Sequence, residues 1–398
     1  MTNATKLLFL PSTHKANKIQ EDLIKKIIRA QTNFIENQFK SAAELWKKVA
    51  DDLKQNIPPP DGLDNIDVRK FTDRHLSSII EFLYKRLTEA GIPSSAIDLQ
   101  AFNLANRFHL LLAFDDPDSA IARVTTKVKE ISSTFPKTIK DIERGKNPGD
   151  VLDPYILAAT EILLFNGNFT KAISATVAHK SLMIIEGLMG HLHEDVLGDM
   201  RGNVRVPEPR GKNQEELNYI QNPFPGADLL QPPTEQGKAI RFHQIKSKTG
   251  SAKGGDGKRL GEQLKRLAEE YEAEVFYDSL IGKTLRGHRS KAGVEKAAPN
   301  VVVLVGDAAF KELTGSQVGP ELLLRVYQNS FQAAAKEMGY SVEAMAANII
   351  KSFNTLAKKH GSQFLEIVLK DSISGDLSEQ DSRIFNENKK NRKQKNKK

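Results

Sequence analysis

The segment Ala239-Ile-Arg-Phe-His-Gln-Ile-Lys246 decides how this 398-residue chain is interpreted. Its β-branched and aromatic residues favour a strand. A second strand candidate, Ala227-Asp-Leu-Leu230, precedes it, and Pro232, Pro233 and Gly237 between the two suit a hairpin connection. The sequence therefore predicts two neighbouring strands joined by a turn.

Polar residues occupy defined positions on these two strands. Because side chains alternate along a strand, Gln244 and Lys246 share a face, which Phe242 also shares, and Ile245 points to the other face. Asp228 lies on the first strand, directly after Pro225-Gly226-Ala227. We expect Asp228, Gln244 and Lys246 to lie close together.

Downstream of this pair, the pattern predicts further alternation of helices and strands. A Gly-rich loop at 250–257 is followed by a predicted helix, a strand, a buried strand, two helices and a last strand. Their ranges are 258–271, 273–281, 300–306, 319–338, 341–359 and 364–369.

Upstream, the chain is predicted to be helical. Apolar residues from Ile19 to Leu53 recur with helical spacing, and the helix ends at Pro58-Pro59-Pro60. Further helices are predicted at 67–90, 95–113, 118–133 and 154–166, followed by a long apolar helix at 172–199. No strand-like alternation precedes residue 200.

The expected fold class is therefore α/β, in the α+β sense, with a helical N-terminal half followed by a compact unit whose mixed central sheet is flanked by helices. We divide the chain into a helical region at 1–170, a core at 171–374 and a polybasic tail at 375–398. The helical region is expected to build a dimer or to clamp a ligand.

Composition excludes several classes of protein. The chain is 39% hydrophobic and 27% charged, which is ordinary for a globular protein, and it has no cysteine. Disulfides, thiolate metal sites and cysteine nucleophiles are excluded, which fits a reducing cytoplasm. The apolar run within Met1–Pro11 is too short for a signal peptide, and no segment reaches the roughly 18 apolar residues of a membrane span. We expect a cytoplasmic protein with no membrane partner.

Positive charge is concentrated in two places. The net charge is +8, and the last ten residues contribute seven of the basic side chains and no acid. Such a tail either aids solubility or attracts a polyanion. Residues 238–266 carry nine basic side chains against two acids, so the strongest local charge coincides with the strand pair.

The residues of the strand pair suit phosphodiester hydrolysis. Carboxylates that hold Mg²⁺ lower the pKa of a bound water and polarise a phosphoryl oxygen, and a neighbouring lysine adds positive charge. Asp228, the Ile245 carbonyl and Lys246 supply these groups. Glu186 lies inside an apolar run of the predicted helix at 172–199, where a carboxylate is costly to bury without a partner. Glu186 either completes a metal site or faces solvent or a lysine.

The order of a helix glutamate, a hairpin aspartate and Gln-x-Lys on the next strand resembles the PD-(D/E)xK nuclease superfamily. The glutamine variant is similar to Mrr-type restriction nucleases, and the 180–310 region is similar to the ApaLI type of type II restriction endonuclease. The resemblance implies that Asp228 binds metal, that Gln244 replaces the second acid, that Lys246 is catalytic and that Glu186 completes the site. Glu194 or Glu216 would substitute if Glu186 pointed elsewhere.

The resemblance further implies a type II restriction endonuclease that hydrolyses double-stranded DNA with Mg²⁺ and leaves a 5′-phosphate. A homodimer is expected, because two-fold symmetry matches palindromic sites. A cognate DNA methyltransferase acting on the same site is the expected partner.

Basic residues near the strand pair are candidates for DNA contacts. The Gly-rich segment offers backbone N–H groups and the side chains of Lys248, Lys253, Lys258 and Arg259 to phosphates. It does not follow the Walker A pattern, so a role at the DNA backbone is preferred to nucleotide binding. The alternative is a mobile surface loop.

Two further motifs have competing interpretations. Arg286 and Arg289 lie between two predicted strands, where they either read guanines in the major groove or belong to a solvated loop. His191-Leu-His193-Glu194-Asp195 invites a zinc interpretation but lacks the second histidine of the His-Glu-x-x-His pattern, since Leu197 takes that place. A helix end with solvated polar groups is the preferred interpretation.

Two other functions stay open. A non-catalytic nucleic-acid-binding protein would grip phosphate with its basic residues, and Gln244 would mark a lost active site. A DNA repair nuclease would recognise structure rather than sequence.

Overall fold

A computed structural model describes most of the chain. The described residues are 21–55, 58–68, 73–132, 153–207, 224–234, 238–248, 256–283, 289–316, 319–338 and 342–373. They divide into two compact units, the first made of 1–125 with 189–331 and the second of 126–188 with 332–398. The polybasic tail and most of the Gly-rich loop lie outside the described residues.

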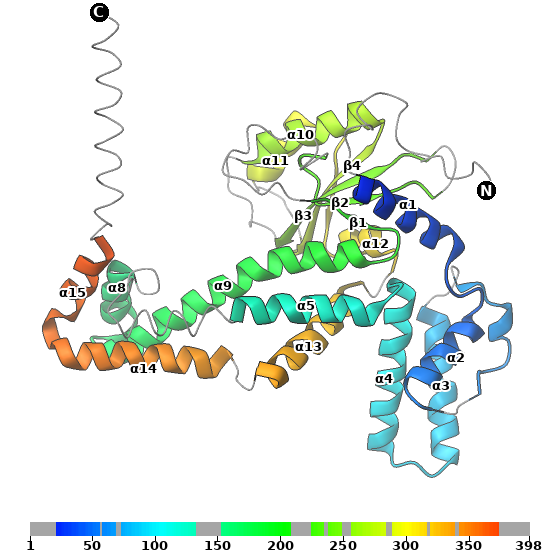
Figure 1. Cartoon of the computed structure of the whole chain (residues 1–398), viewed down its shortest axis with the longest axis horizontal. Helices are drawn as coiled ribbons and strands as arrows, with labels where there is room; N and C mark the ends of the chain where they lie inside the picture. Colours follow the sequence, from blue (N-terminus) through cyan, green and yellow to red (C-terminus); the bar gives the residue numbers. More distant parts are fainter. Residues whose placement is uncertain are drawn as a thin grey trace, which may run out of the picture. The chain divides into compact units, whose positions relative to one another are not determined.

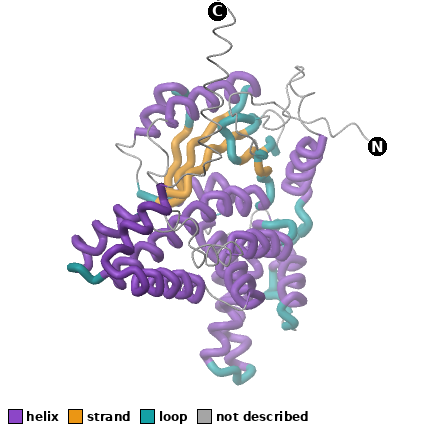
Figure 2. Tube along the Cα trace, turned by 60° about the vertical axis from the view of Figure 1, so that its left-hand side comes forward, coloured by secondary structure: helices purple, strands orange, loops and turns teal. Residues whose placement is uncertain are grey.

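The first unit contains a five-stranded mixed sheet (Figures 1 and 2). In chain order and in spatial order the strands are β1 (Val204–Arg205), β2 (Leu229–Gln231), β3 (Arg241–Lys248), β4 (Glu274–Ile281) and β5 (Val302–Val305). The pairs β1–β2 and β2–β3 are antiparallel, whereas β3, β4 and β5 run parallel. The predicted mixed sheet and the β2–β3 pairing are confirmed.

Helices cover both faces of this sheet (Figure 1). Helices α10 (Asp256–Tyr271) and α11 (Arg289–Ala297) pack on one face, and α12 (Asp307–Thr314) lies on the other. The end of α9 (Phe169–Asp199) also lies on the second face, because Gly190 is close to Ser247, which points away from α10. Helix α10 connects β3 to the parallel strand β4 across one face of the sheet.

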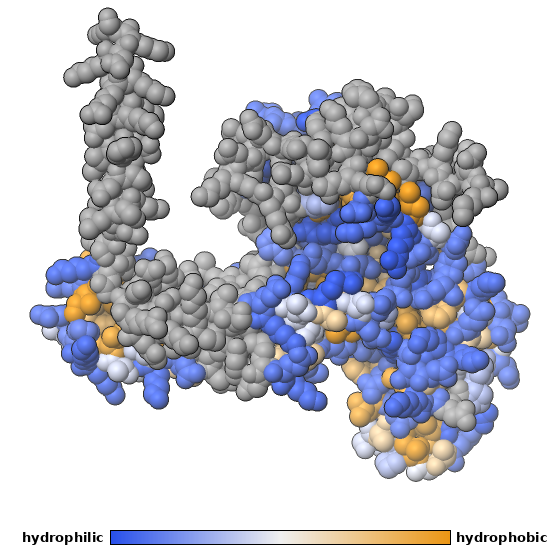
Figure 3. Space-filling model, viewed as in Figure 1, coloured by the Kyte–Doolittle hydropathy of each residue, from blue (hydrophilic) through white to orange (hydrophobic). Residues whose placement is uncertain are grey.

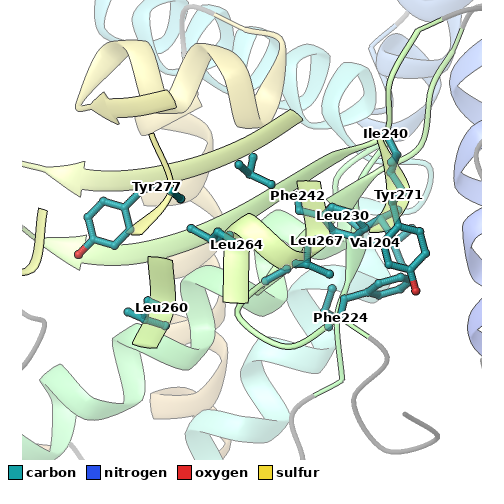
Figure 4. Packing of buried hydrophobic residues seen from close by; sticks show 14 of the residues in the cluster. Val204, Phe224, Leu230, Ile240, Phe242, Leu260, Leu264, Leu267, Tyr271 and Tyr277 are labelled. Atoms are coloured by element: carbon teal, nitrogen blue, oxygen red, sulfur yellow. The ribbon is translucent and has the colours of Figure 1, made fainter. Parts of the chain in front are cut away.

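The core between α10 and the sheet is built from alternate residues of the strands and one stripe of the helix (Figure 4). Phe224, Phe242 and Tyr271 form an aromatic cluster with ring centroids 5.0 to 5.6 Å apart. Around them pack Val204, Leu230, Ile240, Leu260, Leu264, Leu267, Val275 and Tyr277. Burial of Phe242 fixes which face of β3 turns toward α10.

The N-terminal segment forms a separate helical core in the same unit. It consists of α2 (Ala42–Asp52), the short η2 (Leu63–Asn65), α3 (Asp73–Glu89) and α4 (Ser94–Ala113). Helix α1 (Glu21–Glu36) instead packs against the sheet core through Leu23 and Ile27. Trp46, Leu83 and Phe108 are fully buried among α2, α3 and α4.

The single helix expected from Ile19 to Leu53 is wrong, since α1 and α2 are separated at 37–41. The Ser41 hydroxyl accepts the N–H of Glu44 at 3.3 Å, and the Glu44 carboxylate accepts the N–H of Lys40 at 2.8 Å. This reciprocal capping arrangement starts a new helix.

Apolar side chains are also exposed on this unit. Figure 3 shows hydrophobic side chains gathered where α3 and α4 meet, and α4 carries the exposed Leu99 and Phe102. The guanidinium of Arg325 lies over the Phe102 ring at 4.0 Å from its centroid. Most other coloured side chains on this face are hydrophilic.

The second unit is helical throughout its described residues. It contains α8 (Pro154–Phe165), α14 (Val342–His360), the short η4 (Gly361–Gln363) and α15 (Phe364–Ile373). The boundary between the units falls within α5 (Pro117–Ser132), α9 and α13 (Gly319–Met338). The strand expected at 364–369 is wrong, because Phe364 and Val368 lie one helical turn apart and pack together in the core of this unit.

Other differences from the sequence-based expectations are local. The strand β1 was not expected, and helix α11 occupies part of the segment between the strands predicted at 273–281 and 300–306. The strand β5 is less buried than expected, with Val302 42% exposed. None of the described helices combines the length and the apolar character of a membrane span.

Candidate active site

A tight turn places Asp228 at the start of β2. The Ala227 N–H donates to the Phe224 carbonyl at 3.1 Å, and Gly226 has a φ of 92°. A Cβ on Gly226 would lie 2.6 Å from the Gln263 side chain of α10. Only glycine suits both the backbone angle and this close approach, so the Pro-Gly turn fixes the position of Asp228.

The backbone and the side chain of Asp228 connect three strands. Its N–H donates to the His243 carbonyl at 2.8 Å, and its carbonyl accepts the Val206 N–H at 2.9 Å. Its carboxylate Oδ2 accepts the Ile245 N–H at 2.6 Å and is also contacted by the Gln244 amide Nε2. The carboxylate thus continues the β2–β3 hydrogen-bonding pattern beyond the point where β2 begins.

Opposing charges surround Asp228. Burial raises the pKa of Asp228 to about 7, and the negative charge of Glu194 adds to the rise. The positive charge of Lys246, the Ile245 N–H and the charge of Arg205 act in the opposite direction. Two acidic side chains therefore share one enclosed region, which favours either a proton or a cation between them.

Gln244, Ile245 and Lys246 follow one another on β3 beside Asp228. Gln244 and Ile245 are buried, and Lys246 is partly exposed. In the β3–β4 register Gln244 is opposite Tyr277 and Lys246 is opposite Ser279. Within the described part of the chain, the Lys246 ammonium has no ion pair at 4.0 Å or less. Lys246 therefore keeps its charge available beside Asp228.

Glu194 of α9 is the carboxylate whose negative charge raises the pKa of Asp228. Glu194 is 14% exposed and forms an ion pair with Arg205 of β1. Arg205 also contacts the Asp195 carboxylate at 3.2 Å and donates to the Asp228 carbonyl at 3.3 Å. Its guanidinium therefore connects α9, β1 and the start of β2.

The sequence offers two other glutamates for a metal site, Glu186 and Glu216. Glu186 lies on the part of α9 that belongs to the second unit, and its side chain is exposed. Glu216 lies outside the described residues. Among the described residues, Glu194 is the carboxylate whose charge acts on Asp228.

The segment around Glu194 is not a solvated helix end. His193 is buried, and its Nδ1 lies 2.8 Å from the Tyr327 hydroxyl. Burial lowers the pKa of His193 to about 4. Its neighbour His191 is exposed, at 4.0 Å from the Glu194 carboxylate. The two histidines point to different environments, which does not suit a shared zinc ion.

The residues predicted to contact DNA are only partly described. Lys258 and Arg259 lie exposed on the first turn of α10, 3.7 Å from Glu262 and 3.8 Å from Asp256 respectively. Lys248 ends β3 and Arg289 begins α11, and their side chains are not described. Lys253 and Arg286 lie outside the described residues.

Sequence reasoning missed two features of the site. Arg205 was signalled only by the alternation Val204-Arg205-Val206, which is typical of a short strand. The second feature is a buried pair in which His243 Nδ1 lies 2.8 Å from Asp278 Oδ2, with neither side chain exposed. Burial raises the pKa of Asp278, and the hydrogen bond with His243 opposes the rise.

The donor set of the site suits a hard divalent cation. It offers the carboxylates of Asp228 and Glu194, the Ile245 carbonyl and the Gln244 amide, and Mg²⁺ prefers oxygen ligands of these kinds. In the described residues, no three His, Asp or Glu side chains are already gathered around one point. Each carboxylate has an internal partner instead, since Asp228 accepts from Ile245 and Gln244, and Glu194 pairs with Arg205.

No known family model matches this chain, and no curated protein matches it.

Proposed function

We propose that the chain is a Mg²⁺-dependent type II restriction endonuclease that hydrolyses phosphodiester bonds of double-stranded DNA. The observation that carries the proposal is the placement of four residues on α9, directly before β2 and on β3. Glu194 lies on the helix before the sheet, Asp228 at the start of β2, and Gln244 and Lys246 on β3, which α10 connects to a parallel strand. The PD-(D/E)xK resemblance implies this order of elements.

In this proposal Asp228, Glu194 and the Ile245 carbonyl hold the cation, and Gln244 stands where a second acid would stand. The Gln244 amide nitrogen contacts Asp228, so its oxygen would reach a cation only after the amide group turns over. A bound Mg²⁺ would supply an acidic water and positive charge at the phosphate.

Lys246 has a separate role in the proposed reaction. Its ammonium lies beside Asp228 without an ion pair in the described residues, and there it can hold an attacking water and offset negative charge on the phosphate. The basic stretch from 238 to 266 would attract the DNA backbone. A homodimer would place two such sites on the two strands of a palindrome.

Cleavage of plasmid DNA by the purified full-length chain tests the proposal. We expect discrete fragments that need Mg²⁺, and we expect Lys246→Ala to lower the rate by about 100-fold or more, because a positioned acid–base group contributes about that much. Lys311→Ala is the matched control, since Lys311 is an exposed lysine of α12 that lies outside the basic stretch from 238 to 266. Its rate should stay within about twofold of the wild type, as is usual for exposed residues.

Other outcomes identify the alternatives. Salt-dependent DNA binding without cleavage by any variant would favour a non-catalytic binding protein. Mg²⁺-dependent cutting only at junctions or flaps would favour a repair nuclease. Full activity of Lys246→Ala would show that Lys246 is not the catalytic lysine.

A further inference from the structure

Arg205 occupies an unusual position beside the candidate metal site. All three nitrogens of its guanidinium are engaged, Nη2 with Glu194, Nε with Asp195 at 3.2 Å and Nη1 with the Asp228 carbonyl at 3.3 Å. Its side chain is 22% exposed, so water screens these contacts less than those of a surface pair. One fixed positive charge is thus shared by the two acids of α9 and by Asp228, the residue directly before β2.

The backbone holds Arg205 close to α9. A Cβ added to Gly198 would lie 2.7 Å from the Cβ of Arg205 and 3.0 Å from its Cα and N. Glycine therefore lets β1 approach the helix closely, one turn after Glu194 and Asp195. The guanidinium reaches both acids because of this approach.

We propose that Arg205 is an internal counter-ion which a divalent cation displaces from Glu194, so that Arg205 sets how readily the site takes up metal. The inference rests on the proposed function, since Glu194 is taken as a metal ligand. The positive charge of Arg205 and that of a divalent cation compete for the same carboxylate. When the cation binds Glu194, the guanidinium loses only that contact. It keeps its contacts with Asp195 and the Asp228 carbonyl, so the exchange needs no movement of β1.

The proposed exchange predicts whether metal affinity rises or falls when the Arg205 guanidinium is removed. Removing the guanidinium leaves Glu194 without its competitor and makes the site more negative, so metal should bind more tightly. If Arg205 instead served to orient Glu194 for the metal, removing it would weaken binding. The two roles predict opposite changes in the dissociation constant.

The test is calorimetric titration of the full-length chain with Mn²⁺, without DNA. For Arg205→Met we expect Mn²⁺ to bind about tenfold more tightly than to wild type, which corresponds to about 1.4 kcal/mol. The matched control is Arg241→Met, because Arg241 of β3 forms an ion pair with Glu312 of α12. Mn²⁺ affinity of this control should stay within about twofold of wild type, since the two sites share no partner.

A second variant covers the case in which Arg205→Met does not fold. Arg205→Lys keeps the charge but cannot hold two carboxylates in one planar fork, so we expect Mn²⁺ to bind about threefold more tightly. Equal or weaker binding by the folded Arg205 variants would overturn the inference.

Asp228→Asn separates that failure from failure of the proposed function. If Asp228→Asn abolishes Mn²⁺ binding while the Arg205 variants bind as wild type does, the metal site stands and the counter-ion role falls. If wild-type binding is absent, or is unchanged in Asp228→Asn, both fall.

Discussion

At the scale of single residues, the buried pair of His243 and Asp278 stabilises the packing of β3, which carries Gln244 and Lys246, against β4. His243 follows Phe242 on β3, its carbonyl accepts the Asp228 N–H, and its ring stacks on Phe276 with centroids 4.6 Å apart. Asp278 is fully buried on β4, opposite Ile245 in the register. A buried carboxyl group without its partner is costly, so the two residues act as a unit.

We therefore predict that His243→Leu lowers the free energy of unfolding by about 3–5 kcal/mol, because it leaves Asp278 buried and unpaired. The double variant His243→Leu/Asp278→Leu should recover at least half of that loss, since no buried polar group is then left over. Urea unfolding of the two variants and of Asp278→Leu measures the coupling. Additive losses in the double variant would contradict a coupled pair.

The choice between Glu186 and Glu194 shows how far single residues can be predicted from sequence. Asp228, Gln244 and Lys246 could be grouped because strand alternation and a turn are local patterns. Glu186 attracted attention because apolar residues surround it in the sequence, whereas its side chain is exposed. The importance of Glu194 depends on Arg205 and Asp228, which come from other elements, and no local pattern contains that information.

At the scale of elements, α10 and α11 pack through glycines. A Cβ on Gly261 would lie 2.7 Å from the Ala297 Cβ and 2.8 Å from the Val294 carbonyl oxygen. A Cβ on Gly257 would lie 2.3 Å from the Ser290 carbonyl oxygen. The two glycines are one helical turn apart, so a groove on α10 receives α11.

We predict that Gly261→Ala destabilises the chain, by about 1–3 kcal/mol, because forced overpacking outweighs the gain of about 1 kcal/mol in helix propensity. Glu262→Ala is the matched control on the next residue, which is exposed, and its effect should stay within about 0.5 kcal/mol. Thermal unfolding followed by circular dichroism measures both. A stabilised Gly261→Ala would mean that the helices separate without cost.

Elements were predicted well where their pattern was long. The helices α9, α10 and α13 and the strands β3 and β4 have many periodic residues, and their ranges differ little from those expected. The segment 364–369 was too short for its period to be read, and packing of Phe364 and Val368 made it helical. Apolar spacing alone does not show the break before Ser41, because it continues across the break, although the Ser41-Ala-Ala-Glu44 cap is present in the sequence.

At the scale of the whole molecule, each of the two units has an apolar core of its own. The core of the second unit joins Leu157, Ile173, Phe353 and Phe364, from helices that are distant in sequence. The sheet core of the first unit contains none of these residues. Sequence periodicity identified the apolar stripes but not their pairing, because pairing depends on contacts between distant segments.

Because each unit has its own core, a core substitution in one unit should speed hydrogen exchange in that unit and not in the other. Phe353 is fully buried, so Phe353→Ala should cost about 3–5 kcal/mol within the second unit. In hydrogen exchange measured by mass spectrometry, we expect faster exchange in α8, α14 and α15 and unchanged exchange in β3 and β4. Phe242→Ala, which removes an equally buried ring from the sheet core, should give the reverse pattern. Equal acceleration of exchange in both sets of elements by either variant would show that the two cores unfold as one cooperative unit, since a local loss of packing speeds exchange everywhere only when the whole chain opens together.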